Sequence, residues 1–281
     1  MHSTLVSCPQ LAASLGDAGW LVYDCRNDLF DREAGRRAYA AGHIPGARHV
    51  HLEEVLSGPI TGRTGRHPLP DPQLFCERMR AAGLSADRQV VAYDGAGGVM
   101  ASRLWWMLRW LGHEAVAVLD GGWNAWVSAN SPVSTQVPAS VPGDFRGSPQ
   151  PWTVDAACLQ ASLGAPDVVV VDARAADRFR GENETLDPVG GHIPGAANYF
   201  FQQNLTAEKT FKSPDDLKTQ WSAVIKGHDS KDVVVYCGSG VTACHNLLAL
   251  EHAGIHGVKI YPGSWSEWSS DPSRPRATEP E

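Results

Sequence analysis

The stretch Val233-Val234-Val235-Tyr236-Cys237-Gly238-Ser239-Gly240-Val241-Thr242-Ala243 decides how this chain of 281 residues is organised. Its apolar, β-branched beginning predicts a strand that ends at a cysteine. A glycine-rich turn follows the cysteine, and a helical pattern begins after the turn. Ligands of open α/β sheets bind beyond the carboxyl ends of the strands, so Cys237 is expected at a ligand-binding edge.

Four landmarks of the sequence occur twice in the same order, which indicates an internal duplication. They are residues 22–26 and 170–174, 42–47 and 191–196, 90–97 and 233–240, and 120–123 and 261–265. In the third pair, Asp94 stands where the second half has Cys237. Because a carboxylate is no substitute for a thiol nucleophile, we expect the first half to be an inactive twin of the second.

Strand-like runs alternate with helical runs in each half, which predicts a parallel sheet covered by helices on both faces. Prolines and small polar residues dominate the stretch between the halves, and they disfavour helices and central strands there. We therefore predict two α/β domains, residues 1–130 and 152–281, joined by a proline-rich linker over residues 131–151. Strands are predicted at 20–23, 116–119, 168–171 and 258–261, and helices at 71–82 and 214–225, with two further helices that end before Gly112 and Gly254.

The composition is that of a globular protein, with 43% hydrophobic and 20% charged residues and a net charge of −7. The acidic balance argues against nucleic acid or an anionic membrane as partner. The N-terminal residues resemble no signal peptide, and no apolar run has the roughly 20 residues of a membrane span. The six scattered cysteines are interpreted as reduced thiols. We thus expect a cytoplasmic protein without metal or cofactor.

The residues around Cys237 are suited to activating a nucleophile. The glycines let successive N–H groups turn inward, and the following helix adds the partial positive charge of its N-terminus. These groups are expected to lower the pKa of the thiol and so favour the thiolate, which is the reactive form. The alternative is a buried structural cysteine. Gly238, Ser239, Gly240, Val241 and Thr242 are the residues expected to hold the sulfur and a bound substrate.

Two further classes of function remain as alternatives. A cysteine-based phosphatase needs an arginine six residues after the cysteine to clamp phosphate, and this chain has Ala243 at that position. A non-catalytic binding module would need no cysteine, and the loop at Asp94 shows what an inactivated copy looks like.

The duplicated Gly-His-Ile-Pro-Gly-Ala turns and the Cys-Gly-Ser-Gly-Val-Thr-Ala loop resemble the two-domain rhodanese family over nearly the whole chain. The resemblance implies tandem rhodanese-like domains, each a parallel sheet flanked by helices. It also implies sulfur transfer by a ping-pong route through a persulfide on Cys237. The donor would be 3-mercaptopyruvate or thiosulfate, and the acceptor cyanide or a thiol, with thioredoxin as one candidate.

Two features of the sequence bear on the choice of donor. The Gly-Ser-Gly loop is similar to that of 3-mercaptopyruvate sulfurtransferases, whereas thiosulfate enzymes usually have basic residues directly after the cysteine. Arg178 matches the first substrate-binding arginine of the family, and a surface arginine is the alternative. The mercaptopyruvate group usually has a second arginine in the segment that is residues 184–189 here, and this segment contains none. Thiosulfate therefore remains an alternative donor.

A Ser–His–Asp relay associated with such loops would use Ser239, His43 and an acid such as Asp31. The alternative for His43 is a structural role in its turn, because the same histidine recurs as His192. Asp172 and Arg174 are expected to form a buried structural pair, as are Asp24 and Arg26.

Overall fold

The computed structural model describes residues 1–139 and 141–279, which form two compact units. Unit 1 consists of Met1–Gly58, Pro70–Gln150 and Ala207–Phe211. Unit 2 consists of Pro59–Leu69, Pro151–Thr206 and Lys212–Glu281. Each unit thus takes in one short segment from the other half of the sequence. The segment Pro59–Leu69 matters most, because it reaches the Cys237 loop.

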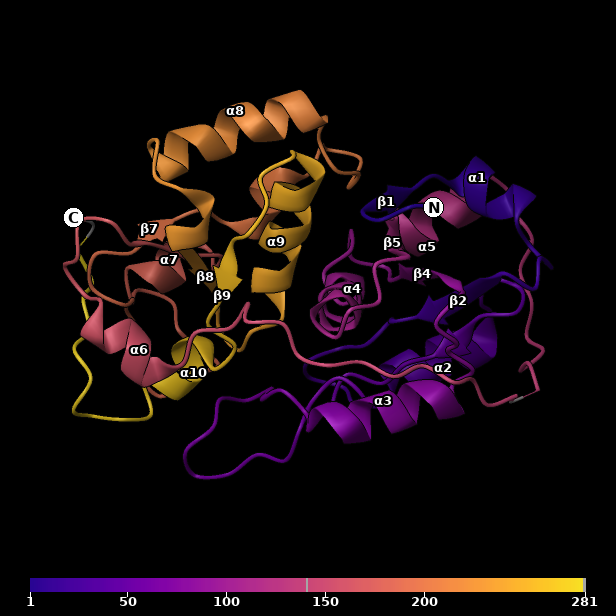
Figure 1. The fold of residues 1–281 in the computed structure, drawn as a ribbon, viewed down its shortest axis with the longest axis horizontal. Coiled ribbons are helices and arrows are strands. Elements are labelled where there is room, and N and C mark those ends of the chain that lie inside the picture. Colours follow the sequence, from indigo (N-terminus) through magenta and orange to yellow (C-terminus); the bar gives the residue numbers. More distant parts are fainter. Residues whose placement is uncertain (140, 280–281) are drawn as a thin grey trace. The chain divides into compact units, whose positions relative to one another are not determined.

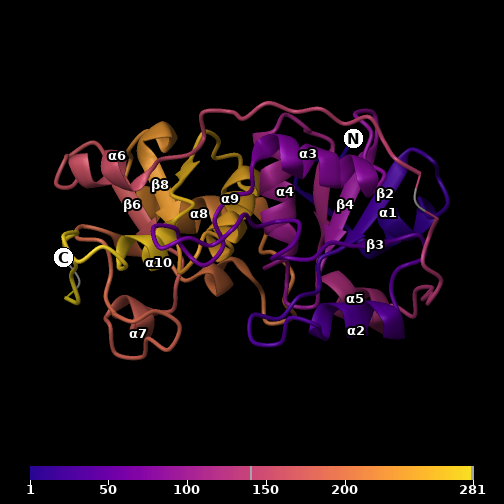
Figure 2. The same ribbon diagram turned by 90° about the horizontal axis from the view of Figure 1, so that it is seen from below.

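Unit 1 is built on a five-stranded parallel sheet with the strand order β1-β5-β4-β2-β3. Helices α3 and α4 lie on one side of this sheet, and α2 and α5 on the other (Figure 2). The elements are β1 Leu5–Val6, α1 Cys8–Ala13, β2 Trp20–Asp24, α2 Ala34–Ala41, β3 Arg48–His49, α3 Pro72–Ala81, β4 Gln89–Tyr93, α4 Ala101–Trp110, β5 Val116–Leu119 and α5 Gly122–Ser128.

Unit 2 repeats this arrangement with a four-stranded parallel sheet of order β7-β6-β8-β9. A parallel bridge between Thr153 and Ile260 takes the place of β1. Helices α8 and α9 lie on one face of the sheet, and α6 and α10 on the other (Figure 1). The elements are α6 Ala156–Ala161, β6 Val169–Asp172, α7 Ala176–Phe179, β7 Ala197–Asn198, η1 Phe201–Asn204, α8 Pro214–Ile225, η2 Ser230–Asp232, β8 Val233–Tyr236, α9 Thr242–His252, β9 Lys259–Ile260 and α10 Ser264–Trp268.

Local signals explain the positions of the predicted helices. The Asp71 carboxylate accepts the N–H groups of the first turn of α3, and Ser213 caps α8 in the same way. In both helices the next residue is proline, whose fixed φ suits the first helical position. The predicted helix 214–225 and strand 116–119 are confirmed, and the other predicted boundaries differ from the observed ones by one or two residues.

The two sheets have equivalent cores, as the duplication predicts. Tyr93 and Trp126 are buried on one face in unit 1, and Tyr236 and Trp268 are buried on the equivalent face in unit 2. The predicted Asp–Arg pairs are confirmed at the ends of β2 and β6. Their shortest N–O distances are 2.5 Å between Arg26 and Asp24, and 2.7 Å between Arg174 and Asp172.

The proline-rich stretch contains no helix or extended strand over its described residues 131–139 and 141–151. It is nevertheless anchored to unit 1, because Gly143 donates its N–H to Arg80 O (2.9 Å) and the Phe145 side chain is buried. A Cβ on Gly143 would lie 1.9 Å from Leu84 O, so only glycine permits this close approach. In the part of the chain that the structure describes, no helix is long and apolar enough to cross a membrane.

Candidate active site

Cys237 directly follows strand β8, and its side chain is almost fully buried (1% exposed). Its Sγ accepts the N–H of Gly240 at 3.1 Å. Gly240 has φ +82°, a conformation that glycine adopts without steric cost. Helix α9 begins at Thr242, so its N-terminus follows the loop. The sulfur therefore has a backbone N–H donor and lies just before the N-terminus of α9.

Residues at the start of α10 form hydrogen bonds with the backbone of the Cys237 loop. Ser264 Oγ accepts the N–H of Cys237 at 3.1 Å and lies 4.0 Å from its Sγ. The N–H groups of Trp265 and Ser266 bind the carbonyl oxygens of Cys237 and Gly238, both at 2.9 Å. Ser264 adopts φ +56°, which is unfavourable for a residue with a Cβ. These bonds hold the main chain of the loop in one position.

Ser239, the second residue after the cysteine, has a histidine as partner. Its Oγ lies 2.7 Å from Nδ1 of His67, and both side chains are buried. The two residues are 172 positions apart in the sequence. They meet because the segment Pro59–Leu69 belongs to unit 2. This hydroxyl–imidazole pair is able to relay a proton beside the cysteine.

Two guanidinium groups lie next to the loop at Gly238. A Cβ built on Gly238 would lie 3.0 Å from Nη2 of Arg66 and 3.5 Å from Nη2 of Arg178. Arg66 comes from the segment Pro59–Leu69, and its N–H binds Ser266 Oγ at 3.0 Å. The predicted Arg178 comes from helix α7. Because Gly238 has no side chain, both cations approach the backbone of the loop.

Two buried carboxylates hold these guanidinium groups. Glu184 binds Nε of Arg178 at 3.0 Å and Nη2 at 2.8 Å, and Asp187 forms a close ion pair with Arg66. Burial opposes ionisation of Glu184, but the N–H of Leu186 and the Arg178 guanidinium hold its pKa below the usual value. Burial raises the pKa of the Asp187 carboxyl, although Arg66 counteracts it.

In the equivalent loop of unit 1, the backbone N–H groups bind the side chain of Asp94. The buried carboxylate of Asp94 accepts four N–H groups at 2.7–2.9 Å, from residues 96 and 98 on one oxygen and 100 and 101 on the other. The loop of the first half therefore encloses an anion that belongs to the chain itself. The Cys237 loop uses its backbone donors differently: the Gly240 N–H binds Sγ of Cys237, and the Cys244 N–H binds Val241 O at 3.1 Å.

The remaining predicted relay residues have other partners. Both ring nitrogens of His43 lie near carbonyl oxygens of unit 1, at 2.8 Å from Tyr39 O and 3.1 Å from Gln136 O. Asp31 is exposed and pairs with Arg37. Both ring nitrogens of His43 thus lie beside carbonyl oxygens and not beside Ser239, which agrees with a structural role in its turn. The histidine bound to Ser239 is His67.

Sequence reasoning missed Arg66, His67 and Ser264. Residues 61–67 form a Gly- and Arg-rich stretch without apolar periodicity, and the second half has no counterpart of it. Its concentration of basic residues was the one available signal. The repeat did not indicate a role for Ser264, because its counterpart is Gly122, which has no hydroxyl group. Among the described residues, no group of three or more His, Cys, Asp or Glu could hold a metal ion.

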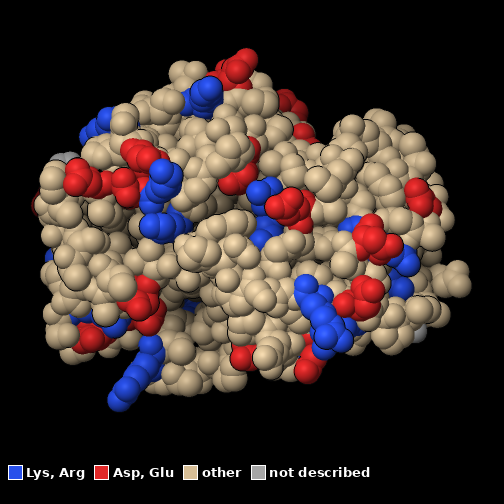
Figure 3. Space-filling view, in the orientation of Figure 1, with Lys and Arg blue, Asp and Glu red and all other residues tan. Residues whose placement is uncertain are grey.

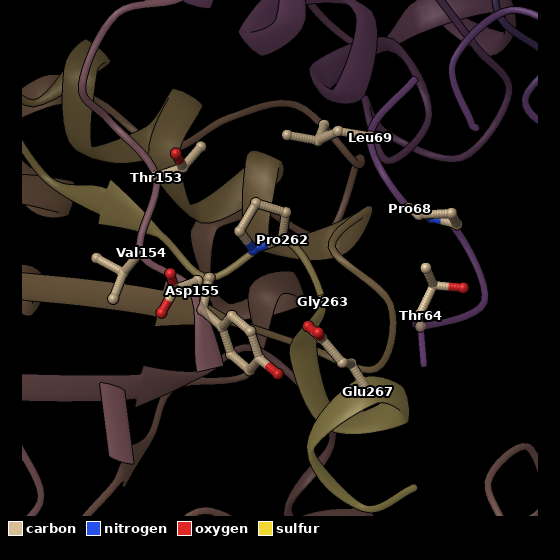
Figure 4. Close-up of a pocket in the computed structure, with 11 residues that line it drawn as sticks. Thr64, Pro68, Leu69, Thr153, Val154, Asp155, Pro262, Gly263 and Glu267 are labelled. Carbon is tan, nitrogen blue, oxygen red and sulfur yellow. The ribbon is translucent and has the colours of Figure 1, made fainter. Parts of the chain in front are cut away.

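The segment Pro59–Leu69 also borders a separate cavity of about 230 Å³ in unit 2. Figure 4 shows Thr64, Pro68 and Leu69 of this segment on the right and Val154 on the left, with Glu267 between them. Cys237 does not line this cavity. On the face of the molecule shown in Figure 3, acidic and basic side chains are interspersed, so no extended area of one sign is visible there.

Comparison with known proteins adds independent information. The model of the rhodanese-like domain matches residues 7–129 and 155–271. A probable 3-mercaptopyruvate sulfurtransferase of Pseudomonas aeruginosa is 49% identical over 98% of both chains. A putative thiosulfate sulfurtransferase of Mycobacterium tuberculosis, SseB, is 40% identical over 87% of this chain and 86% of its own. The solved 3-mercaptopyruvate sulfurtransferase from Leishmania major is 30% identical, with a TM-score of 0.84 over 95% of this chain and 74% of its own.

Proposed function

Because the chain belongs to the rhodanese family, we propose that it transfers sulfur from 3-mercaptopyruvate to a thiol or cyanide through a persulfide on Cys237. One observation carries the proposal: the buried Cys237 sulfur accepts a backbone N–H, and two guanidinium groups lie beside the same loop. The family supplies the class of reaction, and this geometry supports an anionic donor. The near-complete coverage of the Pseudomonas aeruginosa relative favours 3-mercaptopyruvate.

In the first half-reaction, the Cys237 thiolate attacks the sulfur of 3-mercaptopyruvate. A bond forms between Sγ and this sulfur, and the bond from sulfur to C3 breaks. Its electron pair forms the enolate of pyruvate, and the proton of the donor thiol ends on C3. Pyruvate leaves, and a persulfide with a negative outer sulfur remains. The His67–Ser239 pair is suited to carry the proton, since it lies two residues from the nucleophile.

The loop would stabilise the persulfide by hydrogen bonds to its outer sulfur. The twin loop supports this step, because its backbone groups donate four hydrogen bonds to the Asp94 carboxylate. Donors that are already in place stabilise a developing charge without reorganisation. Gly238, Gly240, Val241 and Thr242 supply the backbone of this ring.

The donor's carboxylate would bind Arg178 and Arg66. A guanidinium group binds a carboxylate through two parallel hydrogen bonds, which fixes its orientation as well as its position. Arg66 compensates for the arginine that is absent from residues 184–189. We expect Arg178→Ala to raise KM for 3-mercaptopyruvate about tenfold to hundredfold, the loss of one hydrogen-bonded charge.

In the second half-reaction, an acceptor attacks the outer sulfur and restores the Cys237 thiolate. Cyanide gives thiocyanate, and a thiol such as that of thioredoxin gives a persulfide. Thiosulfate is the second candidate donor, with sulfite as leaving group, and the similarity to the putative thiosulfate sulfurtransferase SseB favours it. None of the six cysteines, all of which the structure describes, forms a disulfide, which is consistent with a reducing compartment such as the cytoplasm.

The proposal is tested by replacing Cys237 with serine. We expect Cys237→Ser to abolish pyruvate release from 3-mercaptopyruvate and the mass increase of 32 Da, the mass of one sulfur atom, which the wild type should show with donor alone. The exposed Cys158 provides a matched control, and Cys158→Ser should keep both signals. The far-ultraviolet circular dichroism of both variants should match the wild type. Sulfur transfer by folded Cys237→Ser would refute the mechanism.

A further inference from the structure

The charged side chains behind the Cys237 loop balance one another. The ion pairs join Arg66 to Asp187, Arg178 to both Asp187 and Glu184, and Arg174 to both Glu184 and Asp172. We call these six residues the arginine cluster. With every group ionised, the cluster has three positive and three negative charges, so its net charge is zero. The two guanidinium groups near Gly238 therefore do not act as free cations.

The carboxylates of the arginine cluster are withdrawn from solvent. The side chains of Asp172, Glu184 and Asp187 are 0%, 4% and 3% exposed, whereas those of Arg66 and Arg178 are 29% and 21% exposed. The acids thus lie behind the arginines, and the arginines are the parts of the cluster that an incoming anion would meet. Water and salt screen buried charges weakly, so the acids reduce the attraction that such an anion experiences.

Of the three carboxylates in the arginine cluster, that of Asp187 has the fewest hydrogen-bond partners. Its Oδ1 pairs with Arg66, while its Oδ2 lies 3.6 Å from Nη2 of Arg178 and accepts no hydrogen bond from the described residues. Glu184, in contrast, binds Arg178 through both oxygens and also accepts two backbone N–H groups. Replacement of Asp187 therefore removes one charge between the two arginines and leaves the Glu184 contacts in place.

We propose that Asp187 is a specificity-determining residue that makes the donor site favour a monoanion over a dianion. The inference rests on the proposed function. 3-Mercaptopyruvate carries one negative charge on its carboxylate, and thiosulfate carries two. A neutral arginine cluster provides directed hydrogen bonds for one carboxylate but no excess positive charge for a second one. Without the Asp187 charge the cluster has a net charge of +1. The electrostatic attraction energy of this charge is twice as large for the dianion thiosulfate as for the monoanion 3-mercaptopyruvate.

The size of the effect follows from Coulomb's law. One unit charge at about 6 Å, in a medium of effective dielectric constant about 40, corresponds to roughly a tenfold change in an equilibrium or rate constant. We therefore expect Asp187→Asn to raise the ratio of kcat/KM for thiosulfate to kcat/KM for 3-mercaptopyruvate about tenfold.

The experiment measures kcat/KM for both donors at one pH and at several ionic strengths, with cyanide as acceptor. It compares the wild type with Asp187→Asn and Asp187→Glu. Glu182→Gln is the matched control, because Glu182 is an exposed acid in the same loop that pairs with Arg180. Asp187→Glu restores the charge and should restore the wild-type ratio. In Asp187→Asn, kcat/KM for thiosulfate should fall more steeply with added salt than in the wild type.

The ratio separates a charge effect from a merely structural one. If Asp187 only holds Arg66 in place, Asp187→Asn lowers kcat/KM for both donors equally, and the unchanged ratio overturns the inference. An equal rise of the ratio in Glu182→Gln would also overturn it, because any acid of the loop would then suffice. Failure of the proposed function looks different: the wild type itself would transfer sulfur from neither donor.

Discussion

Asp94 offers a direct test of the idea that this loop architecture is built around an anion. The carboxylate has four backbone N–H partners, two on each oxygen. Hydrogen bonds to a charged group contribute about 1.5–3 kcal/mol each. A cavity of about 290 Å³, lined by Asp94, Gly95 and Met100 among others, lets water reach some donors when the carboxylate is removed. We therefore expect Asp94→Ala to cost about 4 kcal/mol, roughly half of the summed bonds.

Asp94→Asn distinguishes charge from shape. The asparagine carbonyl oxygen would keep the N–H groups of Ala96 and Gly98, but its NH2 group would face the N–H groups of Met100 and Ala101. Two donors then face each other in a buried site, which leaves both unsatisfied. The nearly isosteric Asp94→Asn should thus destabilise at least as much as Asp94→Ala.

The assay is urea unfolding followed by tryptophan fluorescence and circular dichroism, with the free energy taken from midpoint and slope. Asp87→Asn serves as control, because Asp87 is an exposed acid of the same unit (86% exposed), and it should match the wild type within 0.5 kcal/mol or so. The reasoning is refuted if Asp94→Asn costs less than about 1 kcal/mol while Asp94→Ala is severely destabilised, since shape alone would then explain the site.

Two further predictions concern the supports of the active site. A Cβ on Gly65 would lie 2.5 Å from Gly263 O, so Gly65→Ala should displace Arg66 and His67 and lower kcat/KM at least tenfold, with unchanged circular dichroism; wild-type kinetics would contradict this. Glu184 has a depressed pKa, so it adds stability above its unfolded-state pKa of 4.5, and this stability is lost as pH falls through the lower folded-state pKa. Glu184→Gln should therefore cost about 3 kcal/mol in urea unfolding at pH 7, with the difference shrinking below pH 4.5; a difference independent of pH would exclude this electrostatic origin.

Much of the fold was predictable from the sequence because its signals are local or repeated. Valine-rich runs predicted the central strands, glycines predicted the ends of two helices, and the duplication provided each signal twice. The Asp172–Arg174 pair was predictable because Asp172 ends β6 and Arg174 follows it two positions later. Cys237 was identifiable as the candidate nucleophile because the repeat replaces it with Asp94.

The partners of Cys237 could not be predicted in the same way. Arg66 and His67 lie in a segment without strand or helix periodicity, and they reach Gly238 and Ser239 only because that segment packs into unit 2. The sequence analysis expected a histidine at the loop but selected His43, whose ring nitrogens lie beside carbonyl oxygens of unit 1. Residues 184–189 contain no arginine, and the second guanidinium group near Gly238 comes from Arg66, far away in the sequence.

The sequence by itself determined the two sheets, the loop around Cys237 and the difference between its two copies, since backbone propensity and covalent order act over a few residues. Tertiary structure alone decided which further charges lie at that loop beside the predicted Arg178. Arg66 and Asp187 are 121 positions apart, and neither has a sequence signal that points to the other. Their pairing depends on which segment covers which edge of the sheet, and long-range packing decides that.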